Sequence, residues 1–198
     1  MNRGLTVIEH LRRRLCVASV AAMALLAATQ ASAFDPSSPP QPATGTLQAA
    51  FSPWDDIEGL ITQAITGARQ QILVQAYLLS NGTIASALVA AKQRGIDVEI
   101  LVDGLQLKTN NVSKVAALAA AGIPVWVETK YRNAHNKVIV IDPLTPDAAV
   151  ITGSFNFTWS AQHKNAENVL IVRNNPKLAA RYVVNWQRHR QDAAPYTQ

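Results

Sequence analysis

Residues 134–142 have the sequence AHNKVIVID, in which four consecutive β-branched residues follow a lysine. Such an apolar run predicts a buried strand over 137–142. Side chains alternate between the two faces of a strand, so His135 and Lys137 are expected on one face, an imidazole beside an ammonium. Asp142 lies seven positions after His135 and therefore falls on the opposite face, where it suits a turn better than a pairing with the histidine.

The stretch TGSFNFT at 152–158 places Ser154 and Asn156 on one face of an extended chain, and Glu167 follows eleven residues later. The glycine before them, Gly153, allows another backbone to approach closely. Each of these residues alone has an ordinary explanation as part of a polar turn or a solvated surface. Their combination with the imidazole and the ammonium, along neighbouring predicted strands, indicates a functional site.

This set of side chains suits a phosphate group. Lys137 supplies fixed positive charge, and Ser154 and Asn156 supply donors to the non-bridging oxygens. His135 is able to act as a nucleophile or as an acid and base near neutral pH. Glu167 is placed to hold one imidazole nitrogen and leave the other free, as the carboxylate does in a catalytic triad.

The surrounding sequence alternates strand and helix patterns. The predicted strands cover 46–51, 71–79, 96–102, 123–127, 137–142, 148–152 and 168–172. The predicted helices begin at Ser52, at Asn81 and at Asn110 or Asn111, and a last helix covers 176–190. The early alternation argues for parallel strands covered by helices, whereas the later strands change this pattern. We therefore predict an α/β fold with a mixed, largely parallel β-sheet flanked by helices on both faces.

Residues 1–33 have the features of an export signal. Four arginines precede an apolar run over 15–28, which is short for a membrane span, and residues 31–33 form an A-x-A cleavage site. We expect cleavage there, export to the periplasm or the medium by the general secretory or the twin-arginine route, and no stable membrane association afterwards. An uncleaved anchor is the alternative. The proline-rich residues 34–45 are expected to be a linker, and 46–198 a single catalytic domain.

The composition limits the kinds of nucleic-acid contact, disulfide and metal site that the chain can have. The 198 residues carry a formal charge of +5, are 48% hydrophobic and contain one cysteine, Cys16, within the predicted signal. The mature chain would keep 14 Lys and Arg against 12 Asp and Glu, a net charge of +2, so any contact with nucleic acid has to be local. It would have no disulfide, and no acidic cluster or Cys and His array indicates a metal or cofactor.

The motifs resemble those of a known family. HNKVIVID at 135–142 has the His-x-Lys-x4-Asp signature of the phospholipase D superfamily. TGSFNFT, with the downstream NAEN at 165–168, resembles the small bacterial endonucleases of that superfamily. The segment ALVAAKQRGIDVEILVDG at 87–104 is also similar to theirs. The resemblance covers roughly residues 47–190 and implies a phospholipase D-like fold.

The resemblance also implies a role for each residue. His135 would be the nucleophile that forms a phosphohistidine intermediate. Lys137 and Asn156 would bind the phosphoryl oxygens with support from Ser154, and Glu167 would orient His135. The signature aspartate is regarded as structural in this family, which agrees with its place on the opposite face, and the family requires no metal.

The implied reaction uses two histidines, one that attacks phosphorus and one that protonates the leaving oxygen. The chain has one His-x-Lys motif and no internal repeat, and neither His163 nor His189 is followed by a lysine two residues later. We therefore expect a homodimer with one composite site, in which two copies of His135 meet about a two-fold axis.

With the predicted export signal, the resemblance implies an exported phosphodiesterase, a non-specific endonuclease that cleaves DNA and, as the lesser alternative, RNA. Candidates for contacts to the nucleic-acid backbone are Lys108, Lys130, Arg132 and Lys164, and a solvated surface explains each of them equally well. Two alternatives stay open. One is a phospholipase D acting on lipid head groups, because both substrates are phosphodiesters, and the other is a nucleic-acid-binding module without catalytic activity.

Overall fold

The computed structural model describes residues 39–40, 42–109 and 113–197. The chain divides into two compact units, Met1–Pro42 and Ala43–Gln198, and nearly all of the description concerns the second. The predicted export signal with Cys16, and the predicted helix caps Asn110 and Asn111, lie outside the described residues. Residues 42–44 of the predicted linker are exposed and have no regular secondary structure. Within the described ranges, no helix is long and apolar enough to cross a bilayer.

The strands are β1 Thr46–Ser52, β2 Gln71–Ala76, β3 Asp97–Asp103, β4 Val125–Glu128, β5 Lys137–Ile141, β6 Ala149–Gly153, β7 Glu167–Arg173 and β8 Ala194–Pro195. The helices are α2 Ile57–Gly67, α3 Gly82–Gln93, α4 Gly104–Thr109, α5 Val115–Ala120, α6 Trp159–His163 and α7 Pro176–Gln191. Every predicted strand is present. The sequence pattern did not predict α4, α6 and β8, because segments of two to six residues carry almost no periodic signal.

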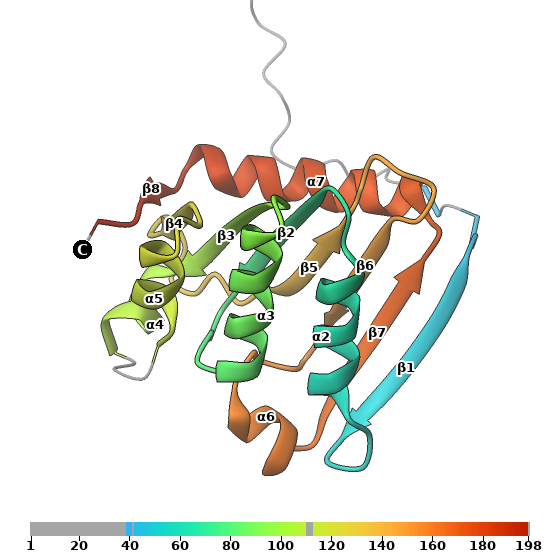
Figure 1. The fold of residues 1–198 in the computed structure, drawn as a ribbon, viewed down its shortest axis with the longest axis horizontal. Coiled ribbons are helices and arrows are strands. Elements are labelled where there is room, and N and C mark those ends of the chain that lie inside the picture. The colour runs from blue at the N-terminus through green and yellow to red at the C-terminus, as the bar shows by residue number, and fades with distance from the viewer. Residues whose placement is uncertain (1–38, 41, 110–112, 198) are drawn as a thin grey trace, which may run out of the picture. The chain divides into compact units, whose positions relative to one another are not determined.

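All strands join one sheet in the order β1-β7-β6-β5-β2-β3-β4-β8, as Figure 1 shows. The mixed α/β class is confirmed, but the sheet is less parallel than expected. Only the pairings of β3 with β2 and with β4 are parallel, and the other five are antiparallel. Parallel neighbours need a long crossover, whereas β5 and β6 are joined by a short turn.

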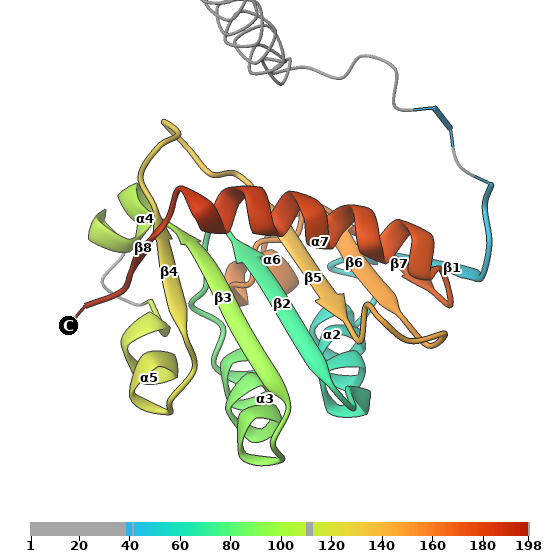
Figure 2. The ribbon, with the colours of Figure 1, turned by 90° about the horizontal axis from the view of Figure 1, so that it is seen from above.

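Helices cover both faces of the sheet, as predicted. Helix α7 lies across one face, and α2, α3 and α5 lie on the other (Figure 2). The buried cluster beneath α7 includes Val140 and Trp186, and the cluster on the opposite face includes Ile139 and Leu88. The neighbours Ile139 and Val140 thus enter opposite cores, which explains why this strand is apolar at every position.

The first helix begins later than predicted. Ser52 is not its N-cap but the last residue of β1, paired with Glu167, and its hydroxyl donates to Ala161 O at 2.7 Å. Helix α2 begins at Ile57 and is capped by Asp56, whose side chain accepts a hydrogen bond at 2.8 Å. Strand pairing with β7 therefore outweighs the local capping signal at Ser52.

Of two other helix starts, that of α3 agrees with the prediction, and that of α5 lies at Val115, after the predicted caps. Helix α3 begins at its predicted cap, because Asn81 Oδ1 accepts from Ile84 N at 2.9 Å, and Gly95 follows its end with φ +88°. Helix α5 begins after Lys114, which makes no side-chain capping bond. The strand predicted over 71–79 ends at Ala76, and the contact with the chain before β5 continues one residue further, where Tyr77 N donates to Asn136 O at 2.8 Å.

Candidate active site

The predicted site residues gather at one end of the sheet, where β2 and β6 end and β5 and β7 begin. Lys137 is the first residue of β5, and Glu167 is the first residue of β7. Ser154 directly follows β6, and Asn156 lies two residues further on. His135 precedes β5 in a segment without regular secondary structure. Antiparallel pairing therefore assembles residues that are far apart in the sequence.

His135 and Lys137 lie on the same side of the chain, as predicted, because both contact Tyr77. The His135 and Tyr77 ring centroids are 4.2 Å apart, with the planes tilted by 58°. Lys137 Nζ lies 4.7 Å from the Tyr77 centroid and donates to His135 O at 3.0 Å. The histidine is exposed, whereas Lys137 is only 6% exposed. An accessible imidazole is thus fixed beside a buried ammonium.

The pKa of the Lys137 ammonium is set by two opposing effects. Burial lowers its pKa below the ordinary lysine value, and the Glu167 carboxylate opposes this shift. Among the described residues, Lys137 forms no ion pair. A largely desolvated cation without a salt-bridge partner is well suited to bind an anionic group such as a phosphate.

Glu167 does not hydrogen-bond to the histidine of its own chain within the described structure. Its Oε2 accepts from Ser154 Oγ at 2.6 Å, and its Oε1 accepts from Asn165 Nδ2 at 2.8 Å. Ser154 Oγ also accepts from Asn168 N at 3.0 Å. The carboxylate is therefore fixed beside Lys137, and the pairing with His135 that the resemblance implied is not formed within one chain.

Asn156 has a side-chain amide that no other described residue engages. Its Oδ1 is buried without a hydrogen-bond partner, which is rare for a polar atom in a folded protein. Its neighbours Phe155 and Phe157 are buried in the core and fix the backbone on either side. The amide is thus rigidly placed, and because its oxygen can only accept, a phosphate oxygen would have to be bound through the Nδ2 donor.

Asp142 and Gly153 both contact backbone groups of neighbouring segments. The buried Asp142 carboxylate accepts hydrogen bonds at 2.7–2.9 Å from three successive backbone amides, those of Arg69, Gln70 and Gln71. It therefore fixes the start of β2 rather than the reacting groups. At Gly153, a Cβ atom would lie 2.2 Å from Asn168 O, so only glycine permits β6 and β7 to approach this closely.

The four candidate cations are exposed and follow strand ends on the same side of the sheet as the site. Lys108 lies in α4 after β3, and Lys130 and Arg132 follow β4. Lys130 Nζ forms an ion pair with Asp192 Oδ2 at 2.5 Å. Lys164 follows α6, with its Nζ 5.3 Å from the Trp159 ring centroid.

The two remaining histidines of the described chain are engaged elsewhere, as expected. The His163 ring lies 4.6 Å from the Trp159 ring on the surface. His189 in the last turn of α7 is hydrogen-bonded to Glu128 at the end of β4. Burial raises the pKa of the Glu128 carboxyl, and the bond to His189 partly offsets this effect. No described contact links either histidine to His135.

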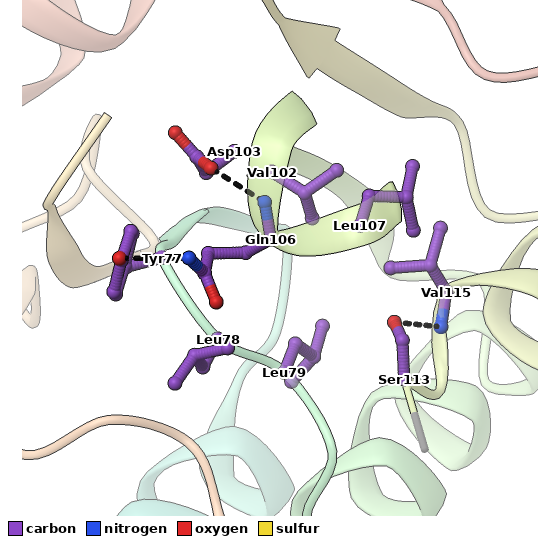
Figure 3. A pocket seen from close by; sticks show the side chains of 9 residues that line it. All are labelled: Tyr77, Leu78, Leu79, Val102, Asp103, Gln106, Leu107, Ser113 and Val115. Carbon is purple, nitrogen blue, oxygen red and sulfur yellow. Dashed lines mark hydrogen bonds between the residues drawn. The ribbon is translucent and has the colours of Figure 1, made fainter. Parts of the chain in front are cut away.

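Sequence reasoning missed a group of hydrogen-bonded residues that fixes Tyr77 and the backbone before His135. Gln106 Nε2 donates to the Tyr77 hydroxyl at 2.8 Å, and Gln106 N donates to Asp103 Oδ1 at 2.8 Å (Figure 3). Asp103 Oδ2 accepts from Ala134 N at 2.6 Å, just before the histidine. The one sequence signal that could have found this group is the position of Asp103, a carboxylate at the end of a buried strand.

Taken together, one end of the sheet carries an exposed imidazole, a buried ammonium, an amide and a carboxylate. Within the described ranges, no group of three His, Cys, Asp or Glu side chains is placed to hold a metal ion. The donor set fits direct phosphoryl transfer to histidine, with charge neutralised by lysine and asparagine. Fold and site are thus those expected of an enzyme that acts on phosphodiesters.

Comparison with known proteins gives the same class. The family described as "Cardiolipin synthase, PLD-like domain" matches residues 61–190. A protein named phospholipase D from Rickettsia prowazekii (strain Madrid E) is 43% identical over 140 residues, which are 71% of this chain and 65% of that relative. The chain therefore belongs to the phospholipase D superfamily, a superfamily of phosphodiester hydrolases, as its motifs predicted.

Solved structures confirm the predicted phospholipase D-like fold. Nuc, a phospholipase D family member from Salmonella typhimurium, superposes with a TM-score of 0.71 at 35% identity. The match covers 78% of this chain and 100% of that one. NucT from Helicobacter pylori has the same fold, with a TM-score of 0.70 at 20% identity over 77% of this chain and 100% of its own.

Proposed function

We propose that the protein is an exported, metal-independent phosphodiesterase that cleaves nucleic acid without sequence preference. The observation that carries this proposal is the placement of an exposed His135 beside a buried Lys137 that has no ion-pair partner in the described structure. His135 attacks phosphorus, a phosphorus–nitrogen bond forms, and the phosphorus–oxygen bond to the leaving group breaks. Lys137 and Asn156 stabilise the negative charge on the non-bridging oxygens.

The second half of the reaction returns the histidine. The leaving oxygen takes a proton from a second imidazole, which then removes a proton from water. The water oxygen attacks phosphorus, and the phosphorus–nitrogen bond breaks. Because each chain supplies one His135, we propose a homodimer in which the two copies share one site. The absence of a bond between His135 and Glu167 within one chain supports this arrangement, since the histidine is left free for a group from the other copy.

Nucleic acid is favoured as the substrate by the side chains around the site. The exposed aromatic residues of the described chain include Phe51, Trp54, Tyr131 and Trp159. All four lie near strand ends at the site end of the sheet; Trp159 contacts Lys164, and Tyr131 lies between Lys130 and Arg132 in the sequence. Aromatic rings interleaved with basic side chains bind single-stranded nucleic acid by stacking and by phosphate contact, without reading the sequence.

A phospholipase D activity is the second candidate, and the name of the Rickettsia relative favours it. The chemistry at phosphorus would be identical, so the two candidates are distinguished by which substrate is cleaved. We would assay plasmid DNA, single-stranded DNA, RNA and phosphatidylcholine vesicles in parallel, in the presence of EDTA. Cleavage of nucleic acid without release of choline supports the nuclease. Choline release without DNA or RNA cleavage contradicts it and supports the lipid enzyme.

The shared site is tested with mixed dimers. Two differently tagged chains, one of them carrying His135→Ala, are expressed together, and the heterodimer is purified through both tags. If each turnover needs both histidines, the heterodimer falls to roughly 1% or less of wild-type activity. Two independent sites would leave it with half. A His135→Asn homodimer serves as the background control. Nuclease activity that it retains comes from a contaminant, and a retained activity equal to that of the wild type would support a non-catalytic role for this chain.

A further inference from the structure

Tyr77 lies at the junction of the nucleophile and the phosphate-binding lysine, and no role has been assigned to it. It is the residue after β2, and its backbone N–H donates to Asn136 O, between the two site residues. Its ring contacts the imidazole of His135 at 4.2 Å and the ammonium of Lys137 at 4.7 Å. Among the described residues, this ring is the one partner that the His135 imidazole has.

The ring is itself held in place from the other side. Gln106 Nε2 donates to the Tyr77 hydroxyl, and the backbone of Gln106 is fixed by Asp103 (Figure 3). The second carboxylate oxygen of Asp103 accepts from Ala134 N, so the same residue fixes the backbone that carries His135. The hydrogen bonds therefore form a closed circuit from the end of β3, through α4 and Tyr77, back to the segment before β5.

We propose that Tyr77 is a positioning residue for the phosphodiesterase reaction, setting the orientation of the His135 imidazole and keeping the Lys137 ammonium charged against its aromatic face. A π face favours the protonated form of a lysine that is shielded from water. The charged or titratable groups that face Lys137 are Glu167 from β7 and Tyr77 after β2, and the ammonium also donates to the backbone oxygen of His135. This inference rests on the proposed roles of His135 and Lys137, but not on nucleic acid being the substrate.

The decisive variant is Tyr77→Leu, assayed on a small chromogenic aryl phosphodiester so that binding of a long substrate does not enter. We expect kcat to fall roughly 10- to 100-fold with a smaller change in KM, because the nucleophile loses its orientation. The alkaline limb of the kcat profile moves to lower pH, because the Lys137 ammonium loses a group that stabilises its charged form. Tyr77→Phe keeps the ring and the pH profile and loses roughly 3- to 10-fold in kcat.

A readout that needs no turnover separates positioning from folding. In the wild-type protein, the ring proton signal of His135 is displaced by the Tyr77 ring current, and His135→Asn identifies that signal. In Tyr77→Leu it moves to the position of a free histidine, while the signals of His163 and His189 stay in place. Gln106→Ala, which removes only the bond to the hydroxyl, gives a partial displacement and covers the case in which Tyr77→Leu does not fold. Tyr182→Leu, a half-buried tyrosine on α7, is the matched control.

The outcomes are distinct. If Tyr77→Leu is folded and keeps wild-type kcat, alkaline limb and His135 signal, the positioning role is wrong while the proposed function stands. If the wild-type protein hydrolyses no phosphodiester of any kind, the proposed function fails. The positioning role fails with it unless the His135 signal still depends on Tyr77 as described.

Discussion

Glu167 accepts a hydrogen bond from Ser154 Oγ at 2.6 Å, and its carboxylate acts on Lys137 rather than on the histidine of its own chain. One anionic group thus contacts the hydroxyl at the end of β6 and opposes the loss of charge on the buried lysine at the start of β5. The electrostatics around Lys137 are therefore set by residues from three different strand ends.

The pH dependence of catalysis follows from this relationship. Activity that needs the Lys137 ammonium is lost as the pH rises through the pKa of that group. Glu167→Gln removes a cause that raises this pKa, so the pKa falls further and the alkaline limb of kcat/KM moves to lower pH. Profiles of wild type and variant on a small phosphodiester measure the displacement. Glu99→Gln, on the far side of the sheet, should leave the limb in place.

Removing the charge of Lys137 should abolish most of the catalytic rate. Lys137→Met fills the same buried space without a positive charge, and we expect kcat to fall about 10²- to 10³-fold, as for other losses of transition-state charge stabilisation. Lys137→Arg does not rescue, because a planar guanidinium does not fit the buried position beside Tyr77. Single-turnover rates give the effect, and Lys177→Met on α7 is the control. A Lys137→Met protein with near-normal kcat would remove the lysine from the mechanism.

Asp142 should matter for stability and not for the reaction. Asp142→Ala leaves three partly buried backbone amides without their acceptor, and we expect the free energy of unfolding to fall by about 2–4 kcal/mol. Urea denaturation followed by circular dichroism measures it. Asp147→Ala, at an exposed carboxylate 3.9 Å from Arg69, is the control and should change little. Equal losses for the two variants would contradict the role given to Asp142.

Gly153 sets the distance between β6 and β7. In Gly153→Ala, the added Cβ would meet backbone at 2.2 Å, so we expect a clear loss of stability together with lower activity, because Ser154 and Glu167 are displaced. Gly67→Ala, where no atom lies within 4 Å of the added Cβ, should be neutral or slightly stabilising. Thermal unfolding compares the two. A Gly153→Ala protein as stable and active as wild type would show that the two strands tolerate separation.

Arg132 tests the contact with nucleic acid. It is exposed beside the segment that carries His135, and Arg132→Glu should weaken DNA binding at low salt and make the affinity fall less steeply as salt is added. The effect should be the same for unrelated sequences, because phosphates and not bases are contacted. Lys177→Glu, at the start of α7 and at the other end of the sheet, is the charge-matched control. Equal effects of the two substitutions would mean that only total charge matters.

Much of the site was predictable because its residues lie in short segments with strict alternation. His135 and Lys137 are two positions apart, and Asp142 falls on the opposite face by parity. The cap at Asn81 and the buried strands were equally local signals. Ser52 was assigned to the wrong element, because its strand pairs with β7, more than a hundred residues away. Tyr77 was missed for the same reason, since a tyrosine in an apolar run gives no sign of the distant histidine that it contacts.

The bond from Ser52 to Ala161 ties the start of the folded unit to the short helix between Asn156 and Glu167, and Glu167 N donates to Ser52 Oγ at 3.2 Å. These contacts with the site end of the sheet therefore limit how far the N-terminus of a recombinant protein can be shortened. Trimming back to Gly45 keeps the whole of β1 and with it this anchor. Trimming through β1 past Ser52 would remove the anchor of α6 and disturb the segment between Asn156 and Glu167.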